Sequence, residues 1–511
     1  MQSSLQSILQ PILNAISATV VNPMFAITLI NFSFMIFVIF IQRRNTAATW
    51  AWVAAIALVP IGGFIVYMIA GQDSRKQRAF LQKSDEDDIL LSRYLDQNLG
   101  AKEGDPTYDN RVTLFHDGVI KFESLLEDIK NAKTSIFIQY YILRGDEVGR
   151  QLVNALAQKA KEGLEVRLLI DGMGCRANPP EMYDPLLEAG GQLGLFLPPV
   201  LVRINFRNHR KISVIDGTVA YLGGSNIGRE YLGRSKRFGN WRDTHMRMTG
   251  GCVAPLTLRF IMDWNFSAKK SRNRLLLLKT LKQRRFIHRL KETTTEMAVN
   301  PAYFKSPKKN LAQPPVDQHT DMLADAHASG ADIAIISSGP DTVYPFVLHG
   351  FCTMIMKAKK SVYIQSPYFV PDDALFTALR IAGLRGIDVR IMYPANPDHP
   401  FVYWAGSSYV GELMCTGVKG YEYEKGFIHS KTIMIDGKMA SVGTANMDVR
   451  SFKINFETQA FIKDEAITAE LEAAFMRDIK DCKQLTLEGY NQRNWRVQVR
   501  ESISRLFSPL I

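Results

Sequence analysis

The chain has 511 residues, enough for two or three domains that each bury a core of their own. Its formal net charge of +12 favours an anionic partner, either a nucleic acid or an anionic membrane surface. The five cysteines are scattered singly, which argues against a zinc site or a disulfide framework and fits a reducing compartment.

Two apolar stretches near the N-terminus predict a pair of transmembrane helices. At about 1.5 Å per helical residue, residues 24–41 and 50–70 both suit a hydrocarbon core of about 30 Å. A cleaved signal peptide would carry a basic leader, yet no basic residue precedes Arg43. A buried core hairpin would be damaged by Pro60-Ile-Gly-Gly63, which a membrane-spanning helix tolerates. We therefore expect a membrane region over residues 1–71, and the basic residues after it favour a cytoplasmic catalytic region.

The rest of the chain predicts two copies of one α/β unit. Ala132-Lys-Thr-Ser-Ile-Phe-Ile-Gln139 returns as Ala358-Lys-Lys-Ser-Val-Tyr-Ile-Gln365, and Gly163-Leu-Glu-Val-Arg-Leu-Leu169 returns as Gly386-Ile-Asp-Val-Arg-Ile-Met392. Strand, helix and strand at these spacings imply an α/β layer in each half. We expect the two halves to pack face to face. The expected segments are a charged linker at 72–110, a first repeat at 111–265, a basic linker at 266–330, a second repeat at 331–488 and an amphipathic tail at 489–511.

The clearest repeated motif is Asn208-His-Arg-Lys-Ile-Ser-Val-Ile-Asp216, which returns as Ile428-His-Ser-Lys-Thr-Ile-Met-Ile-Asp436. Side chains alternate along a strand, so the His and the Lys of each copy face the same side. An imidazole beside an ammonium is poor core material, because burying an unpaired charge is costly, but it suits the binding and attack of a phosphate. A single copy could be an ordinary exposed strand face, and the duplication argues against that alternative.

Each copy is followed by a small-residue turn that ends in an asparagine and then by an acid. The first turn is Gly223-Gly-Ser-Asn226, followed by Asp243; the second is Gly443-Thr-Ala-Asn446, followed by Glu457. The pattern predicts that the same groups are supplied twice to one cleft.

These residues resemble the signature of the phospholipase D superfamily, a duplicated His-x-Lys-x4-Asp. A finer resemblance, to bacterial cardiolipin synthases, is carried by Trp241-Arg-Asp-Thr-His245, Gln365-Ser-Pro-Tyr-Phe-Val-Pro-Asp372 and Asn446-Met-Asp-Val-Arg-Ser-Phe452, and it covers nearly the whole chain. It implies two phospholipase D-like repeats in a pseudo-twofold, bilobal catalytic region at a bacterial cell membrane. The implied reaction moves a phosphatidyl group from one phosphatidylglycerol to another, giving cardiolipin and glycerol through a phosphohistidine, without a metal or cofactor.

The resemblance also implies roles for the motif residues. His209 would be the nucleophile and His429 the acid and base, although the motif alone leaves these two roles open. Lys211 and Lys431, aided by Asn226 and Asn446, would surround the phosphoryl oxygens.

The four acids receive supporting roles. Each imidazole needs an acceptor for its second ring nitrogen, and we expect Asp243 to orient His209 and Glu457 to orient His429. Asp216 and Asp436 have the wrong strand parity to face the cleft, so we expect them to be structural ion-pair partners.

Three other functions stay open at this point. A hydrolase or headgroup-exchange enzyme could use the same scaffold, and an inactive membrane scaffold is a third possibility. A nuclease could use the basic stretch Lys269 to Lys291 to track phosphates, although the apolar spans count against a nucleic-acid partner. That stretch could equally be a solvated linker or a helix lying on anionic lipid. In the tail, one helical face gathers apolar side chains that could meet lipid or the core, namely Trp495, Val499, Ile503 and Leu506.

Overall fold

The computed structural model describes residues 29–33, 35–36, 46–59, 61–63, 78–196, 206–271, 290, 294–305, 330–506 and 508. The chain divides into two compact units, Met1–Gln77 with Leu201–Asn205, and Arg78–Val200 with Phe206–Ile511. The larger unit contains both repeats.

In the smaller unit, α3 (Thr46–Leu58) buries Ile56 completely against Met35 and Trp52. Among the described residues, no helix is both long enough and apolar enough to cross a membrane. Most of the expected span at 24–41 lies outside the described residues, and of the span at 50–70 they include only 50–59 and 61–63. The predicted transmembrane hairpin is therefore not confirmed.

A sheet of fifteen strands runs through the larger unit, in the order β19-β13-β12-β10-β15-β16-β18-β9-β1-β8-β6-β5-β2-β3-β4. The first repeat supplies β1 (Pro106–Phe115), β2 (Ser135–Tyr140), β3 (Glu165–Asp171), β4 (Gln192–Phe196), β5 (Ile212–Ile215), β6 (Val219–Gly223) and β8 (His245–Thr249). The second supplies β9 (Ala331–Ser338), β10 (Ser361–Gln365), β12 (Asp388–Pro394), β13 (Lys419–Tyr423), β15 (Thr432–Ile435), β16 (Met439–Gly443), β18 (Glu457–Lys463) and β19 (Cys482–Gln484). From β9–β1 outward, the two halves of the sheet follow the same order. The mixed α/β fold expected from the sequence is confirmed.

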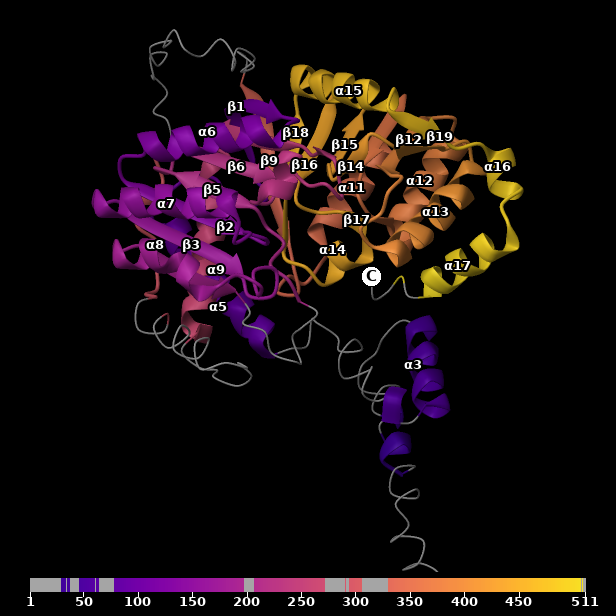
Figure 1. The fold of residues 1–511 in the computed structure, drawn as a ribbon, viewed down its shortest axis with the longest axis horizontal. Coiled ribbons are helices and arrows are strands. Elements are labelled where there is room, and N and C mark those ends of the chain that lie inside the picture. Colours follow the sequence, from indigo (N-terminus) through magenta and orange to yellow (C-terminus); the bar gives the residue numbers. More distant parts are fainter. Residues whose placement is uncertain are drawn as a thin grey trace, which may run out of the picture. The chain divides into compact units, whose positions relative to one another are not determined.

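The halves join edge to edge where β1 pairs with β9 in antiparallel fashion, as the two lobes of Figure 1 show. The register shifts between Thr107 and Asn110, and Asp109 has a φ of 56°, so β1 bends at this point. Strands β16 and β18 also contact β6 across the junction. The expected face-to-face packing is therefore limited to the strands near the junction.

Helices cover both faces of each half. The first repeat has α6 (Gly118–Asn131), α7 (Glu147–Lys161), η2 (Pro180–Tyr183), α8 (Asp184–Glu188), η4 (Arg229–Leu232), α9 (Val253–Ser271) and, after it, η5 (Pro301–Tyr303). The second has α11 (Phe346–Lys357), α12 (Asp373–Leu384), α13 (Pro400–Met414), α14 (Val449–Lys453), α15 (Glu465–Ile479), α16 (Leu487–Asn491) and α17 (Trp495–Leu506). Asp146 and Asp372 cap α7 and α12 by accepting backbone N–H bonds, so the repeated strand-to-helix turns share one capping device.

The expected linker at 72–110 is wrong from residue 78 onward. Residues Arg78–Asp96 form helix α5, which packs on α9 and buries Phe80, Leu90 and Tyr94. Its acidic run suggested a charged linker, but Lys83 on the same helix is fully buried and ion-paired, and β1 begins at Pro106, within the expected linker.

The boundary expected at residue 265 also shifts, because α9 continues to Ser271. Of the basic stretch 269–291, the described residues are 269–271 and 290.

The C-terminal helix α17 packs on α13 through the side opposite to its apolar face. Glu501 and Ser504 are buried, and Glu501 accepts a hydrogen bond from Ser407 on α13. The four apolar side chains singled out in the sequence are all exposed: Trp495, Val499, Ile503 and Leu506. Of the two alternatives for this face, packing on the core is therefore excluded.

Candidate active site

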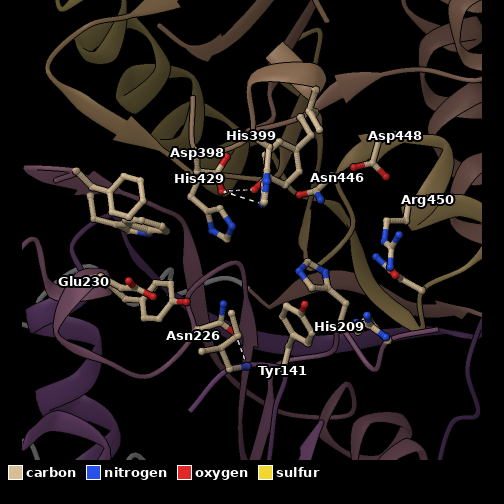
Figure 2. Close-up of a pocket in the computed structure, with 18 of the residues that line it drawn as sticks. Tyr141, His209, Asn226, Glu230, Asp398, His399, His429, Asn446, Asp448 and Arg450 are labelled. Carbon is tan, nitrogen blue, oxygen red and sulfur yellow. Dashed lines mark hydrogen bonds and ion pairs between the residues drawn. The ribbon is translucent and has the colours of Figure 1, made fainter. Parts of the chain in front are cut away.

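The two motif histidines face one cavity of about 550 Å³ between the repeats (Figure 2). His209 directly precedes the segment that leads into β5, and its backbone N–H donates to the Phe456 carbonyl of the second repeat. His429 follows the short strand β14 (Gly426–Ile428), which pairs with β7 (Asn240–Arg242), and its N–H donates to the Arg242 carbonyl of the first repeat. Each histidine is therefore positioned by the backbone of the other half.

The acids that orient the imidazoles are exchanged between the repeats. His209 Nδ1 lies 2.9 Å from Glu457 Oε1, and His429 Nδ1 lies 2.7 Å from Asp243 Oδ2. The sequence-based pairing of Asp243 with His209 and Glu457 with His429 is wrong. That pairing assumed that each histidine binds the acid of its own repeat. The packing of the halves instead brings the acid of one repeat beneath the histidine of the other.

Both imidazoles are neutral near pH 7. Burial lowers the pKa of His209 to about 4 and that of His429 to about 3, although Glu457 and Asp243 pull in the opposite direction. The histidines hold the pKa values of these two carboxyls below their usual range, so each Nδ1 carries a hydrogen that it donates to a carboxylate. The Nε2 lone pairs are then left for a ligand in the cavity.

Both motif lysines are buried, and their ammonium groups turn back onto the backbone. Lys211 Nζ donates to the His209 carbonyl at 2.6 Å, and Lys431 Nζ donates to the His429 carbonyl at the same distance. Neither lysine is among the described residues that line the cavity. Burial lowers the pKa of Lys211 to about 7 and that of Lys431 to about 8, so both stand close to losing their charge near neutral pH.

The two turn asparagines do line the cavity. Asn226 accepts the Ile142 backbone N–H through its Oδ1 at 3.1 Å, which fixes the orientation of its amide. Asn446 is 4% exposed, and its Oδ1 has no hydrogen-bond partner within the described part of the chain. Asn446 therefore has hydrogen-bonding capacity left for a ligand.

The two motif aspartates lie at the far ends of their strands and do not face the cavity. Asp216 accepts the backbone N–H groups of Lys133, Thr134 and Ser135. Asp436 does the same for residues 359–361. The parity argument from the sequence is confirmed. The expected role as ion-pair partners is wrong, because these carboxylates hold the turns that lead into β2 and β10.

Several other cavity residues were not predicted as site residues. The Tyr141 ring lies 5.0 Å from that of His209, and the Trp241 ring lies 5.2 Å from that of His429. Arg207 lies two residues before His209, so strand alternation could have placed it on the same side. The remaining polar or charged lining residues include Arg144, Glu230, Arg237, Asp398, Asp448, Arg450 and Asn455.

Comparisons with known proteins point to one family. A family model described as "Cardiolipin synthase, PLD-like domain" matches residues 125–237 and 351–479, and one described as "Phospholipase_D-nuclease N-terminal" matches residues 29–72. The cardiolipin synthase of Listeria welshimeri is 40% identical, with 94% of this chain and 98% of the relative covered. The major cardiolipin synthase ClsA of Bacillus subtilis is also 40% identical, with the same two coverages.

Among solved structures, the phosphatidylserine synthase of Haemophilus influenzae has a similar fold. The TM-score is 0.57 at 16% identity, over 82% of this chain and 100% of the other. The sequence identity to curated relatives covers both repeats and the cavity between them. The chain therefore belongs to the cardiolipin synthase family of the phospholipase D superfamily.

Proposed function

We propose that the protein transfers the phosphatidyl group of one phosphatidylglycerol to the terminal hydroxyl of another, through a phosphohistidine on His209. The observation that carries this proposal is that His209 and His429 face one cavity with each Nδ1 held by a carboxylate. A pair of imidazoles arranged in this way supplies one nucleophile and one proton carrier, which a double displacement requires.

In the first step the Nε2 lone pair of His209 attacks phosphorus, and the bond from phosphorus to the glycerol oxygen breaks. His429 gives a proton to that oxygen, and glycerol leaves. In the second step His429 takes the proton from the terminal hydroxyl of a second phosphatidylglycerol. The new alkoxide oxygen attacks phosphorus, the P–N bond breaks, and cardiolipin forms with His209 restored.

His429 must carry a proton to act first as an acid, although burial keeps it neutral in the free site. A phosphodiester that enters the cavity brings a negative charge close to the imidazole and raises its pKa. Binding of the substrate therefore favours the protonated form of His429. Meanwhile Glu457 keeps the Nε2 of His209 directed at phosphorus.

We propose that protein cations and amides, rather than a metal, balance the phosphoryl charge. Lys211 and Lys431 place two positive charges beneath the histidines, and the cavity wall adds Asn226 and Asn446. Metal independence is tested with a chelator, which should leave the rate unchanged. Strong inhibition that added metal reverses would contradict it.

We propose a bacterial cell membrane as the site of action, because both substrates are lipids. The apolar stretches at 24–41 and 50–70 would anchor the chain as a hairpin, with the catalytic region on the cytoplasmic side. Helix α17 would lie on the bilayer, since its exposed apolar residues are flanked by Arg496 and Arg500.

The experiment is incubation of the purified full-length chain with phosphatidylglycerol vesicles, followed by analysis of lipid products and free glycerol. Cardiolipin and glycerol in equal amounts are expected, and His209→Ala and His429→Ala should each abolish turnover. Phosphatidic acid in place of cardiolipin would show a hydrolase instead. Substantial turnover by either variant would contradict the two-histidine mechanism.

A further inference from the structure

The two repeats place different side chains at equivalent positions in the walls of the cavity. Arg207 lies two residues before His209, and Phe427 lies two residues before His429. Glu230 lies four residues after Asn226, and Arg450 lies four residues after Asn446. At each pair of positions the two repeats supply side chains of different chemistry, and all of them line the cavity except Phe427, which packs against lining residues.

A third pair shows the same difference. Trp241 lies two residues before Asp243, and Asn455 lies two residues before Glu457. The two ends of the cavity are therefore built for different groups, although the histidines, lysines and orienting acids are duplicated.

The end beside His209 carries two guanidinium groups, those of Arg207 and Arg450. Desolvation and then the charge of Arg207 lower the pKa of the half-buried Arg450, and Arg207 also acts on Tyr141, which contacts the His209 ring. In Figure 2, Arg450 lies on the same side of the cavity as His209. Guanidinium groups bind anionic oxygens well, so this end suits the phosphoryl group that the nucleophile attacks.

The carboxylates near the two arginines are already engaged with backbone groups. Asp171 accepts N–H bonds from Met173, Gly174 and Asn208, and Asp448 accepts one from Ser451. Both carboxylates also interact electrostatically with the arginines, so this end offers guanidinium donors to a ligand rather than a net positive charge.

The end beside His429 is aromatic and acidic. The Trp241 ring lies 5.2 Å from the His429 ring and 4.9 Å from that of Phe427, and Tyr231 packs edge-on against Trp241. Glu230, next to Tyr231, accepts two hydrogen bonds from Arg144 through Oε1, and its side chain is 21% exposed. In Figure 2, Glu230 lies across the cavity from Arg450.

Aromatic faces and a carboxylate together suit an uncharged polyol. The rings cover its carbon skeleton, and the carboxylate accepts hydrogen bonds from its hydroxyls, with charge-assisted strength. Glycerol is the group that leaves in the first step, and a glycerol hydroxyl is the group that attacks in the second. An in-line displacement places both opposite the nucleophile and beside the acid and base.

We propose that Glu230 and Trp241, with Phe427 packed behind the Trp241 ring, form the glycerol subsite, and that this subsite holds the glycerol oxygen beside His429. The proposal rests on the proposed function and adds a specificity residue to it. Glu230 selects a polyol acceptor over a simple alcohol, because a mono-alcohol leaves the carboxylate without its second hydroxyl partner.

The test compares two acceptors in the full-length protein. Phosphatidylglycerol vesicles are supplied with labelled glycerol or with labelled propan-1-ol, and kcat/KM is measured for incorporation of each into lipid. We expect Glu230→Gln to lower the preference for glycerol over propan-1-ol about 10- to 100-fold, the range for a lost charge-assisted hydrogen bond. An unchanged ratio, including an equal loss with both acceptors, would overturn the proposal.

Two control variants separate specificity from structure. Arg144→Gln removes the partner of Glu230 but keeps the carboxylate, so the glycerol preference should persist; its loss would show that the ion pair matters rather than the carboxylate. Arg229→Gln changes an exposed neighbour and should leave activity unchanged.

The direction of transfer is tested by trapping the intermediate. Acid is avoided during handling because phosphohistidine is acid-labile. A labelled phosphatidyl ester of p-nitrophenol, whose leaving group needs no proton, should leave covalent label on His209 in His429→Ala. Label on His429 in His209→Ala would overturn the assignment of the two ends. If the wild-type protein forms no cardiolipin from phosphatidylglycerol alone, the proposed function fails regardless of these ratios.

Discussion

Glu457 of the second repeat binds His209 of the first, with its Oε1 2.9 Å from His209 Nδ1. Asp243 of the first repeat binds His429 of the second in the same way. The exchange means that neither repeat contains a complete nucleophile and orienter. Activity therefore depends on the β9–β1 junction that holds the two halves together.

The exchanged pairs predict which step each acid supports. Glu457→Gln should slow formation of the phosphohistidine, and Asp243→Asn should slow the steps that need proton transfer by His429. A loss of about 10²- to 10⁴-fold in kcat is expected for each, because an amide can favour the wrong imidazole tautomer. Rapid-quench measurement with a phosphatidyl ester of p-nitrophenol, whose leaving group needs no proton, separates the two. The covalent intermediate should accumulate with Asp243→Asn, and little should form with Glu457→Gln. Accumulation with Glu457→Gln and not with Asp243→Asn would point back to pairing within each repeat.

The motif aspartates should matter for stability rather than for chemistry. Asp216 has a φ of 53° and collects three backbone N–H groups, so Asp216→Ala loses these bonds and strains the turn. We expect a loss of about 2 kcal/mol in the free energy of unfolding, with a smaller loss for Asp216→Asn, which tolerates the same backbone conformation. Thermal unfolding in detergent measures this. A large fall in kcat with an unchanged melting temperature would show a catalytic role.

Much of this architecture could be predicted from the sequence, because the evidence for it is local. The repeated strand and helix segments gave the α/β order of both halves, and strand alternation correctly separated His209 from Asp216. The duplicated motif also implied one shared cleft. These inferences need only the spacing along a strand or between repeats.

What the sequence could not give depends on packing between distant segments. The partner of His209 is set by its backbone bond to Phe456, and no spacing within a repeat encodes that contact. Lys211 was expected beside the phosphate, but its flexible chain turns back to the His209 carbonyl. Helix α5 was predicted as a linker because an acidic run is typical of an exposed segment, and nothing in the sequence shows that Lys83 beside it is buried.

Lys83 predicts a stability effect far from the cavity. Its ammonium lies 2.9 Å from Asp341 and 3.3 Å from Asp263, and Asp263 in turn binds Arg210 of the first motif at 2.6 Å. Lys83→Met would remove the ion-pair partner of the buried Asp341, at a cost of about 3–5 kcal/mol. Lys102→Met, at an exposed position, is the control. Equal unfolding free energies for the two variants in urea would show that the cluster contributes nothing.

The depressed lysine pKa values predict an alkaline limit to activity. Lys211 keeps its proton below about pH 7 and Lys431 below about pH 8, so both charges are present below pH 7 and are lost in turn as the pH rises. His209, with a pKa of about 4, stays neutral over this range and remains a nucleophile. We expect kcat/KM to fall between pH 7 and pH 9, and the fall to begin at higher pH in Lys211→Arg, which leaves the later loss at Lys431. A rate that rises steadily through pH 9 would contradict a role for the lysine charges.

The exposed apolar face of α17 predicts a dependence on the lipid surface. Val499 and Ile503 are 44% and 46% exposed, whereas Glu501 on the opposite side is buried against α13. Inserting both side chains into the interface should stabilise docking, since burying apolar surface is favourable by about 25 cal/mol per Å². The double variant Val499→Gln with Ile503→Gln keeps helix propensity and should reduce the rate on phosphatidylglycerol vesicles about 10-fold, with little change on detergent-dispersed lipid. Gln498→Ala, on the same helix, should leave both rates unchanged. An equal loss on vesicles and in detergent would mean that this face supports the fold and not the contact with lipid.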